Sequence, residues 1–199
     1  AKLASNLPGI NFKGVMSHQA ISGKPDKETR LIEGRKFIQM CLDVRDAIEQ
    51  EGIPVEMVSS GETFTYDVAP DMPGVTEVEG GTYALMSTAY SYLPEFQIAV
   101  KILGTIVSAP QSNMSVGDVG RRALASPNGV LPTLEGLPTV RVSELHDNHI
   151  IFHSDGPMPL TVGDRFLLHS GQQDILVNRW DQFVAVRRGF VECVWQILA

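Results

Sequence analysis

One long amphipathic helix between two short apolar segments is the feature that most limits what this chain can fold into. The helix is predicted at about residues 28–51, because its apolar residues fall mostly on one face and Gly52 is well placed to end it. Residues 10–16 before it and residues 54–59 after it have the pattern of short strands. Strand, helix and strand in this order predict parallel βα units.

The second part of the chain has a different pattern. A third strand is expected at residues 75–78, but beyond about residue 93 short strands alternate with turns such as Pro127-Asn128-Gly129, as in an all-β module. We therefore expect an α/β part at residues 1–92 and a β domain at residues 93–199. A closed (β/α)8 barrel needs eight strands and roughly 250 residues, so this chain cannot build one alone.

Composition and charge exclude some classes of function and indicate a location. The chain has 199 residues and a net charge of −7, which gives it no electrostatic reason to bind nucleic acid or an anionic membrane. The longest uncharged apolar stretch, residues 102–109, is far shorter than the roughly 20 residues of a membrane-spanning helix. Residues 1–12 lack a basic start followed by an apolar core, so no signal peptide is expected there, and Cys41 and Cys193 form no disulfide framework. A cytoplasmic location is therefore expected.

The first residues read as the end of a helix. The chain begins with Ala1 rather than methionine, and an apolar patch on a helix as short as residues 1–7 cannot bury itself. We expect that a tag was removed or that a longer upstream part is missing.

Two loops of small and hydroxylated residues follow consecutive predicted strands. Residues 59–65 and residues 77–83 place backbone N–H groups and hydroxyls where an anion can bind, and the paired glycines permit close approach of a ligand. Each loop alone is explained as well by an ordinary polar turn. Neighbouring strands of a barrel, however, put both loops on the same face.

Two of the five histidines have informative neighbours. His146 lies at a predicted strand end, and His169 shares one predicted loop with Asp174. An imidazole and a carboxylate are both ordinary ligands of a divalent metal, but two ligands do not define a site. A lone histidine is more often structural or on the surface.

In these stretches the chain resembles the C-terminal half of D-threonine aldolases and D-serine dehydratases. These are pyridoxal-phosphate enzymes of the alanine-racemase fold type, in which a TIM-like barrel is joined to a β domain. Residues 58–65 resemble the family's Gly/Thr phosphate loop, and residues 75–83 resemble the phosphate-binding strand end that follows it. Residues 116–124 resemble the signature DAGRKAL, and residues 143–146 resemble SEEH.

The resemblance implies a pyridoxal 5'-phosphate site and a metal site. His146 is implied in proton transfer or substrate placement, and His169 is implied as a catalytic residue that holds Mn, Mg or Zn together with Asp174. The family's metal motif is HCDPTVN, whereas Gly171 stands two positions after His169 and residues 174–178 resemble DPTVN, as if three residues were inserted. Asp174 then replaces the usual ligand, or the metal is lost. The residues implied in phosphate binding are Ser60, Gly61, Thr63, Gly81, Thr82 and Tyr83.

The family's Schiff-base lysine lies near the N-terminus of the full chain, in a segment like RPHxK. No lysine here has that context, so none is assigned to this role; the lysines are Lys2, Lys13, Lys24, Lys27, Lys36 and Lys101. The resemblance therefore implies a chain that needs the missing N-terminal barrel half, from the same or another chain. By analogy with fold-type relatives, it also implies a homodimer.

The first expectation for function is a metal-assisted aldolase that cleaves D-3-hydroxy amino acids, such as D-threonine, to glycine and an aldehyde. Residues 174–178 and 191–197 look closer to that branch of the family. The alternatives are a D-serine dehydratase (ammonia-lyase) and an amino-acid racemase. A non-catalytic pyridoxal-phosphate-binding module, or an inactive fragment, is an alternative of another class.

Overall fold

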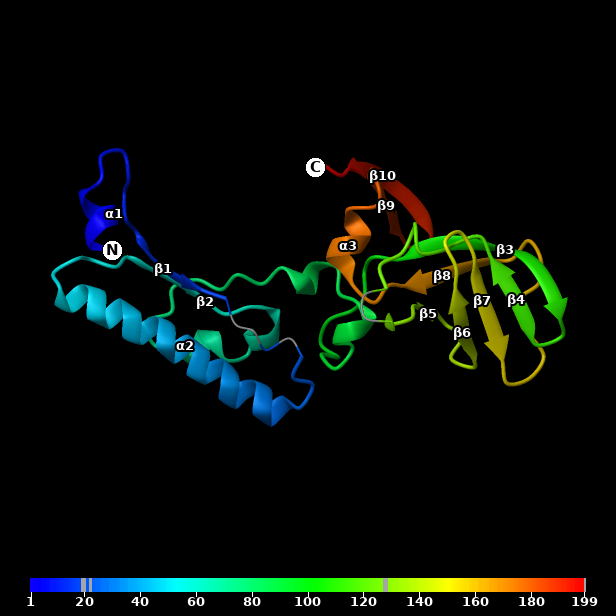
Figure 1. Ribbon diagram of the computed structural model, residues 1–199, viewed down its shortest axis with the longest axis horizontal. Helices are drawn as coiled ribbons and strands as arrows, with labels where there is room; N and C mark the ends of the chain where they lie inside the picture. Colours follow the sequence, from blue (N-terminus) through cyan, green and yellow to red (C-terminus); the bar gives the residue numbers. More distant parts are fainter. Residues whose placement is uncertain (19–20, 22, 127–128, 199) are drawn as a thin grey trace. The chain divides into compact units, whose positions relative to one another are not determined.

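The computed structural model describes residues 1–18, 21, 23–126 and 129–198 (Figure 1). The chain divides into two compact units, Ala1–Ala84 and Leu85–Ala199, and each is described by itself. Along the described part of the chain, no helix combines the length and the apolar character that crossing a membrane requires.

The first unit is a parallel βα unit. The strands β1 (Gly14–Ser17) and β2 (Met57–Ser60) pair in parallel with Val15 opposite Val58, and the long helix α2 (Lys27–Gln50) connects them. A short helix, α1 (Lys2–Asn6), precedes them, and three 3-10 turns follow: η1 (Thr63–Thr65), η2 (Ala69–Asp71) and η3 (Thr82–Ala84). The expected parallel strand order is confirmed, but the third strand is reduced to a single parallel bridge between Ser59 and Glu77.

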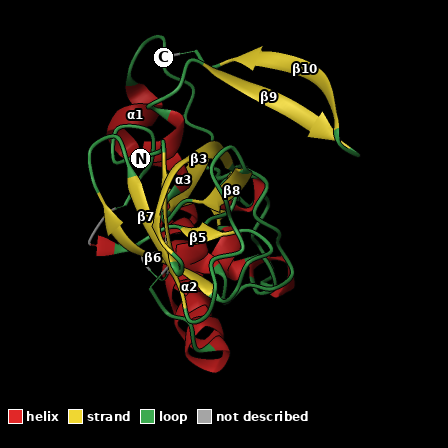
Figure 2. Ribbon diagram, turned by 90° about the vertical axis from the view of Figure 1, so that its right-hand side faces the viewer, coloured by secondary structure: helices red, strands yellow, loops and turns green. Residues whose placement is uncertain are grey.

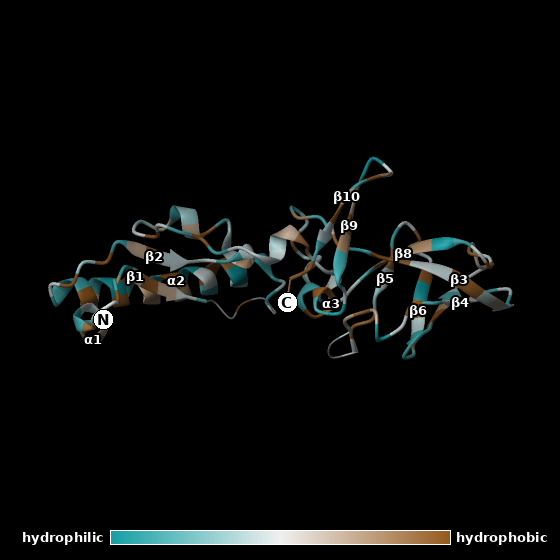
Figure 3. Ribbon diagram, turned by 90° about the horizontal axis from the view of Figure 1, so that it is seen from above, coloured by the Kyte–Doolittle hydropathy of each residue, from teal (hydrophilic) through white to brown (hydrophobic). Residues whose placement is uncertain are grey.

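Local sequence explains where α2 begins and which face it buries. The side chain of Asp26 accepts a hydrogen bond from the backbone N–H of Thr29 at 2.7 Å, which caps the first turn. Hydrophobic and hydrophilic residues alternate along the helix (Figure 3). The buried face consists of Arg30, Gly34, Ile38, Cys41 and Leu42. Ile38 is fully buried and packs with Val58 of β2, a burial that contributes about 1.5–3 kcal/mol.

The second unit is built on a six-stranded antiparallel sheet. Its strand order is β5-β8-β3-β4-β7-β6. The bounds are β3 (Ile102–Gln111), β4 (Met114–Gly117), β5 (Thr133–Leu134), β6 (Val140–Leu145), β7 (Ile150–Ser154) and β8 (Arg165–His169). Phe152 and Phe166 meet edge to face in the core, with ring centroids 5.0 Å apart. This unit is the expected all-β module.

Outside the sheet lie the 3-10 turn η4 (Thr88–Tyr90), the helix α3 (Gln173–Val177) and a separate hairpin. The hairpin joins β9 (Gln182–Arg187) to β10 (Phe190–Gln196), and it stands clear of the sheet (Figure 2). Phe183 packs against the core of the unit. The opposite face of the hairpin is lined by exposed valines at positions 184, 186, 191 and 194.

His169 and Asp174 were expected in one loop, but α3 begins at Gln173 and places Asp174 in its first turn. Of the expected turn Pro127-Asn128-Gly129, the first two residues lie outside the described residues.

Candidate functional site

The loop that follows β2 begins with a sharp turn at Gly61. This residue has φ +115°, and a Cβ placed there would lie 2.7 Å from the Cβ of Ala69, so both the conformation and the space require glycine. The backbone N–H of Glu62 then donates to Oγ1 of Thr65 at 2.9 Å. The side chains of Thr63 and Thr65 are buried. The loop is therefore held in one conformation at the carboxyl end of β2.

The second loop is joined directly to the first. The backbone N–H of Tyr83 donates to Oγ1 of Thr63 at 3.0 Å, and the backbone N–H of Glu79 donates to the carbonyl oxygen of Gly61 at 3.2 Å. The structure thus brings Ser60, Gly61 and Thr63 together with the segment that contains Gly81, Thr82 and Tyr83. This proximity was expected from consecutive parallel strands.

The second loop leaves room for a ligand. A Cβ added at Gly81 would meet nothing within 4 Å. Among the described residues, the backbone N–H groups of Gly81 and Thr82 have no hydrogen-bond partner. Unpaired N–H groups beside open space, with threonine and tyrosine hydroxyls nearby, fit a phosphate group.

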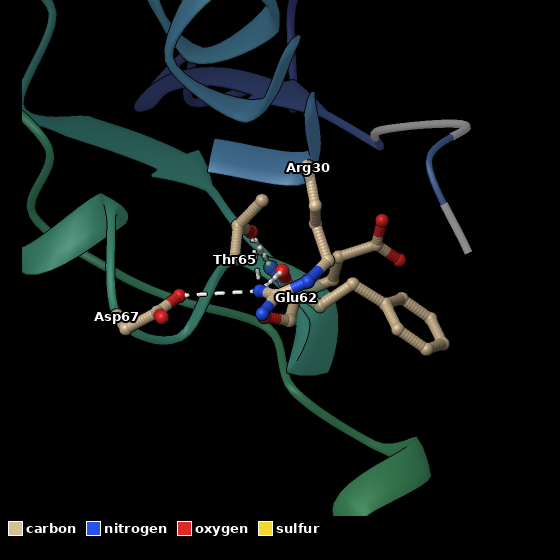
Figure 4. A network of polar contacts seen from close by, with 5 residues as sticks. Arg30, Glu62, Thr65 and Asp67 are labelled. Atoms are coloured by element: carbon tan, nitrogen blue, oxygen red, sulfur yellow. Dashed lines mark hydrogen bonds and ion pairs between the residues drawn. The ribbon is translucent and has the colours of Figure 1, made fainter. Parts of the chain in front are cut away.

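Charged side chains that sequence reasoning missed lie in and beside the first loop, among them Arg30, Glu62 and Asp67 (Figure 4). Arg30 is 3% exposed, and its Nη1 donates to the carbonyl oxygen of Phe64 at 2.6 Å and lies 3.4 Å from Oδ1 of Asp67. Glu62 is also buried, and its Oε2 lies 3.5 Å from Nε2 of His18. Burial raises the pKa of the Glu62 carboxyl, and the nearby His18 opposes that shift. The sequence did hold a signal for Arg30, because this charged residue stands on the apolar face of α2.

The candidate residues of the second unit have other partners. Nε2 of His169 is buried, lies 3.5 Å from Oε2 of Glu135 and has no hydrogen-bond partner among the described residues. Glu135 also accepts a hydrogen bond from Nζ of Lys101 at 2.6 Å, which is the main cause that lowers the pKa of its carboxyl. His146 is exposed, with Nε2 at 3.0 Å from Oε2 of Glu144.

The described side chains do not assemble a metal site. No group of three or more histidine, cysteine, aspartate or glutamate side chains within residues 1–18, 21, 23–126 and 129–198 is placed to hold a metal ion. The carboxylate beside His169 is Glu135, and Asp174 lies in the first turn of α3. Metal ligation by His169 and Asp174 stays a prediction.

Comparisons with known proteins agree with this fold. Residues 99–186 match the family described as "Putative serine dehydratase domain". The chain is 30% identical over 211 residues to a 3-hydroxy-D-aspartate aldolase of Paracoccus denitrificans. That alignment covers 100% of this chain and 54% of the aldolase. Its structure resembles the D-threonine aldolase of Filomicrobium marinum with a TM-score of 0.91 at 22% identity, over 98% of this chain and 55% of that one. It also resembles the alanine racemase of Bacillus anthracis with a TM-score of 0.60 at 13% identity, over 95% and 59%.

The fold is that of the C-terminal part of these two structures: the C-terminal part of a TIM-like barrel followed by a β domain. The chain spans about half the length of the curated relatives it matches. It is similar to D-threonine and 3-hydroxy-D-aspartate aldolases, and it corresponds to about the C-terminal half of these proteins.

Proposed function

We propose that the protein containing this chain is a pyridoxal-phosphate-dependent lyase, and that this chain supplies its phosphate cradle. The observation that carries the proposal is the hydrogen bond from the N–H of Tyr83 to Oγ1 of Thr63. This bond joins the two loops that offer N–H groups and hydroxyls to a phosphate, at the carboxyl ends of adjacent strands. The carboxyl ends of barrel strands are where barrel enzymes place their sites. Similarity to D-threonine and 3-hydroxy-D-aspartate aldolases supports the choice of cofactor.

Pyridoxal phosphate, when bound, supplies an electron sink for the negative charge that develops at the substrate's Cα. The residues of this chain would hold its phosphate. Gly81 and Thr82 offer backbone N–H groups, and Ser60 and Tyr83 offer hydroxyls. Oγ1 of Thr63 accepts from Tyr83 and still carries a proton that it can donate to an anion.

The proposed reaction is cleavage of a D-3-hydroxy amino acid, similar to D-threonine, to glycine and an aldehyde. This proposal follows the aldolase relatives. His146, whose imidazole is exposed and paired with Glu144, is proposed to move or hold a proton of the substrate. His169 is proposed as a second catalytic residue, and no step is assigned to a metal because the described side chains do not form a site for one.

A D-serine dehydratase is the second candidate, because the matching family model over residues 99–186 carries a dehydratase description. The two functions differ in their products. The intact protein, supplied with pyridoxal phosphate, is incubated with D-threonine and separately with D-serine. Glycine and acetaldehyde from D-threonine support the aldolase, and pyruvate with ammonia from D-serine supports the dehydratase. Neither activity, together with no binding of pyridoxal phosphate, would refute both.

Further features of the whole protein are proposed as well. The missing N-terminal barrel half is proposed to complete the α/β part, with the domain boundary at residues 92–93. A homodimer and a cytoplasmic location are proposed with it.

A further inference from the structure

Arg30 is a buried charge that the proposed chemistry does not use. It stands in the first turns of α2, on the face that otherwise carries Gly34, Ile38 and Leu42. Only 3% of the residue is exposed, and burying a guanidinium is costly unless its partners compensate. Its partners are the carbonyl oxygen of Phe64 and the carboxylate of Asp67, on either side of Thr65 (Figure 4). Both partners of the guanidinium therefore lie in one short segment after β2.

That segment is the loop that carries the candidate phosphate residues. Phe64 is the middle residue of η1, and the preceding residue, Thr63, receives the hydrogen bond from the N–H of Tyr83. The helix α2 also approaches the same turn closely at Gly34, because a Cβ added there would lie 2.7 Å from Cγ2 of Thr65. A displacement of the Phe64 carbonyl would therefore move Thr63, and with it the second loop.

We propose that Arg30 is a positioning residue for phosphate binding: its guanidinium holds the Phe64 carbonyl, so that Thr63 and the segment of Gly81 and Thr82 keep the geometry that receives the phosphate. The inference rests on the proposed function, because it concerns the same cradle. Arg30 acts through Phe64 and contacts no ligand itself. Its removal is expected to weaken interactions with the phosphate and to spare those with the rest of the cofactor.

The test compares a ligand that has the phosphate with one that lacks it. The intact protein is titrated with pyridoxal phosphate and with pyridoxal, and both affinities are measured for the wild type, Arg30→Met, Arg30→Lys and Arg35→Met. Arg35 is exposed on the same helix and serves as the matched control. Thermal unfolding of each variant is recorded in parallel.

Arg30→Met is expected to lower the affinity for pyridoxal phosphate by about tenfold to hundredfold, the effect of losing a hydrogen bond from a charged group. Its affinity for pyridoxal should stay within about twofold of the wild type. Arg35→Met should change neither. Arg30→Lys keeps the charge with a less suitable donor geometry, so it should lose only part of the preference for the phosphate.

Equal losses for both ligands would overturn the inference, because they would mean that Arg30 supports only the fold. Unchanged binding in both Arg30 variants would overturn it as well. If Arg30→Met does not fold, Arg30→Lys decides between these outcomes by the ratio of the two affinities. A wild type that binds pyridoxal as tightly as pyridoxal phosphate would instead refute the phosphate cradle of the proposed function, and the role of Arg30 with it.

Discussion

Replacement of Gly61 by alanine is expected to destabilise the first unit through two separate effects. The backbone at Gly61 has φ +115°, and holding a side chain in such a sparsely populated region costs about 1–3 kcal/mol. The new Cβ would also lie 2.7 Å from the Cβ of Ala69, and overpacking of this kind costs about 1–3 kcal/mol. Together the loss is about 2–6 kcal/mol, a large share of the roughly 5–15 kcal/mol that stabilises a typical domain.

Urea unfolding followed by circular dichroism measures this loss. The control is Gly52→Ala, because Gly52 also has a positive φ, +79°, but a Cβ there meets nothing within 4 Å. The control should therefore lose only the backbone part, about 1–2 kcal/mol. Adding Ala69→Gly to Gly61→Ala should restore the part due to overpacking. If Gly61→Ala loses no more than the control, the close approach of Gly61 to Ala69 is absent and the reasoning is refuted.

Three further results are expected. Gly81→Ala should leave the free energy of unfolding within about 1 kcal/mol of the wild type, because its Cβ enters open space, yet it should weaken binding of pyridoxal phosphate in a titration; unchanged affinity would remove Gly81 from the cradle. Burial raises the pKa of Glu62 in the folded state, so its contribution to stability is complete below the unfolded value near 4.5 and is lost as the pH rises through the folded pKa. The wild type should therefore lose stability relative to Glu62→Gln as the pH rises above about 4.5, and parallel curves would contradict this. Phe152→Ala should destabilise the second unit by about 3–5 kcal/mol in a urea titration, and a loss below about 1 kcal/mol would show that its ring does not fill the core.

The sequence predicts the elements of this fold better than their contacts. Apolar spacing and the Gly52 stop locate α2, because this pattern depends on local periodicity. The third strand of the first unit is reduced to one bridge between Ser59 and Glu77, although the N–H of Glu79 still donates to the carbonyl oxygen of Gly61. These contacts join residues far apart in the sequence, and periodicity does not encode them.

In the candidate site, too, the sequence predicts local pattern better than distant contacts. The two loops were predicted to lie together because consecutive parallel strands end at one edge. Glu135 was not foreseen as the neighbour of His169, because that contact arises when Thr133 of β5 pairs with His169 of β8 across a long separation in sequence. Arg30 was overlooked for a related reason: its partners lie in a turn whose path is set by Gly61 and Ala69.

The pairing of β3 with β8 has a consequence for how the second unit is made on the ribosome. Ile102 pairs with Leu168, so the middle of the sheet cannot be completed until the chain beyond Leu168 has been synthesised. The neighbouring strands β6 and β7 are close in sequence and can pair earlier. We expect the nascent chain to carry an exposed edge of β3 for most of its synthesis, the stage at which such edges recruit chaperones or aggregate. Pulsed hydrogen exchange during refolding should protect the amides of β6 and β7 before those of β8, and the reverse order would contradict this.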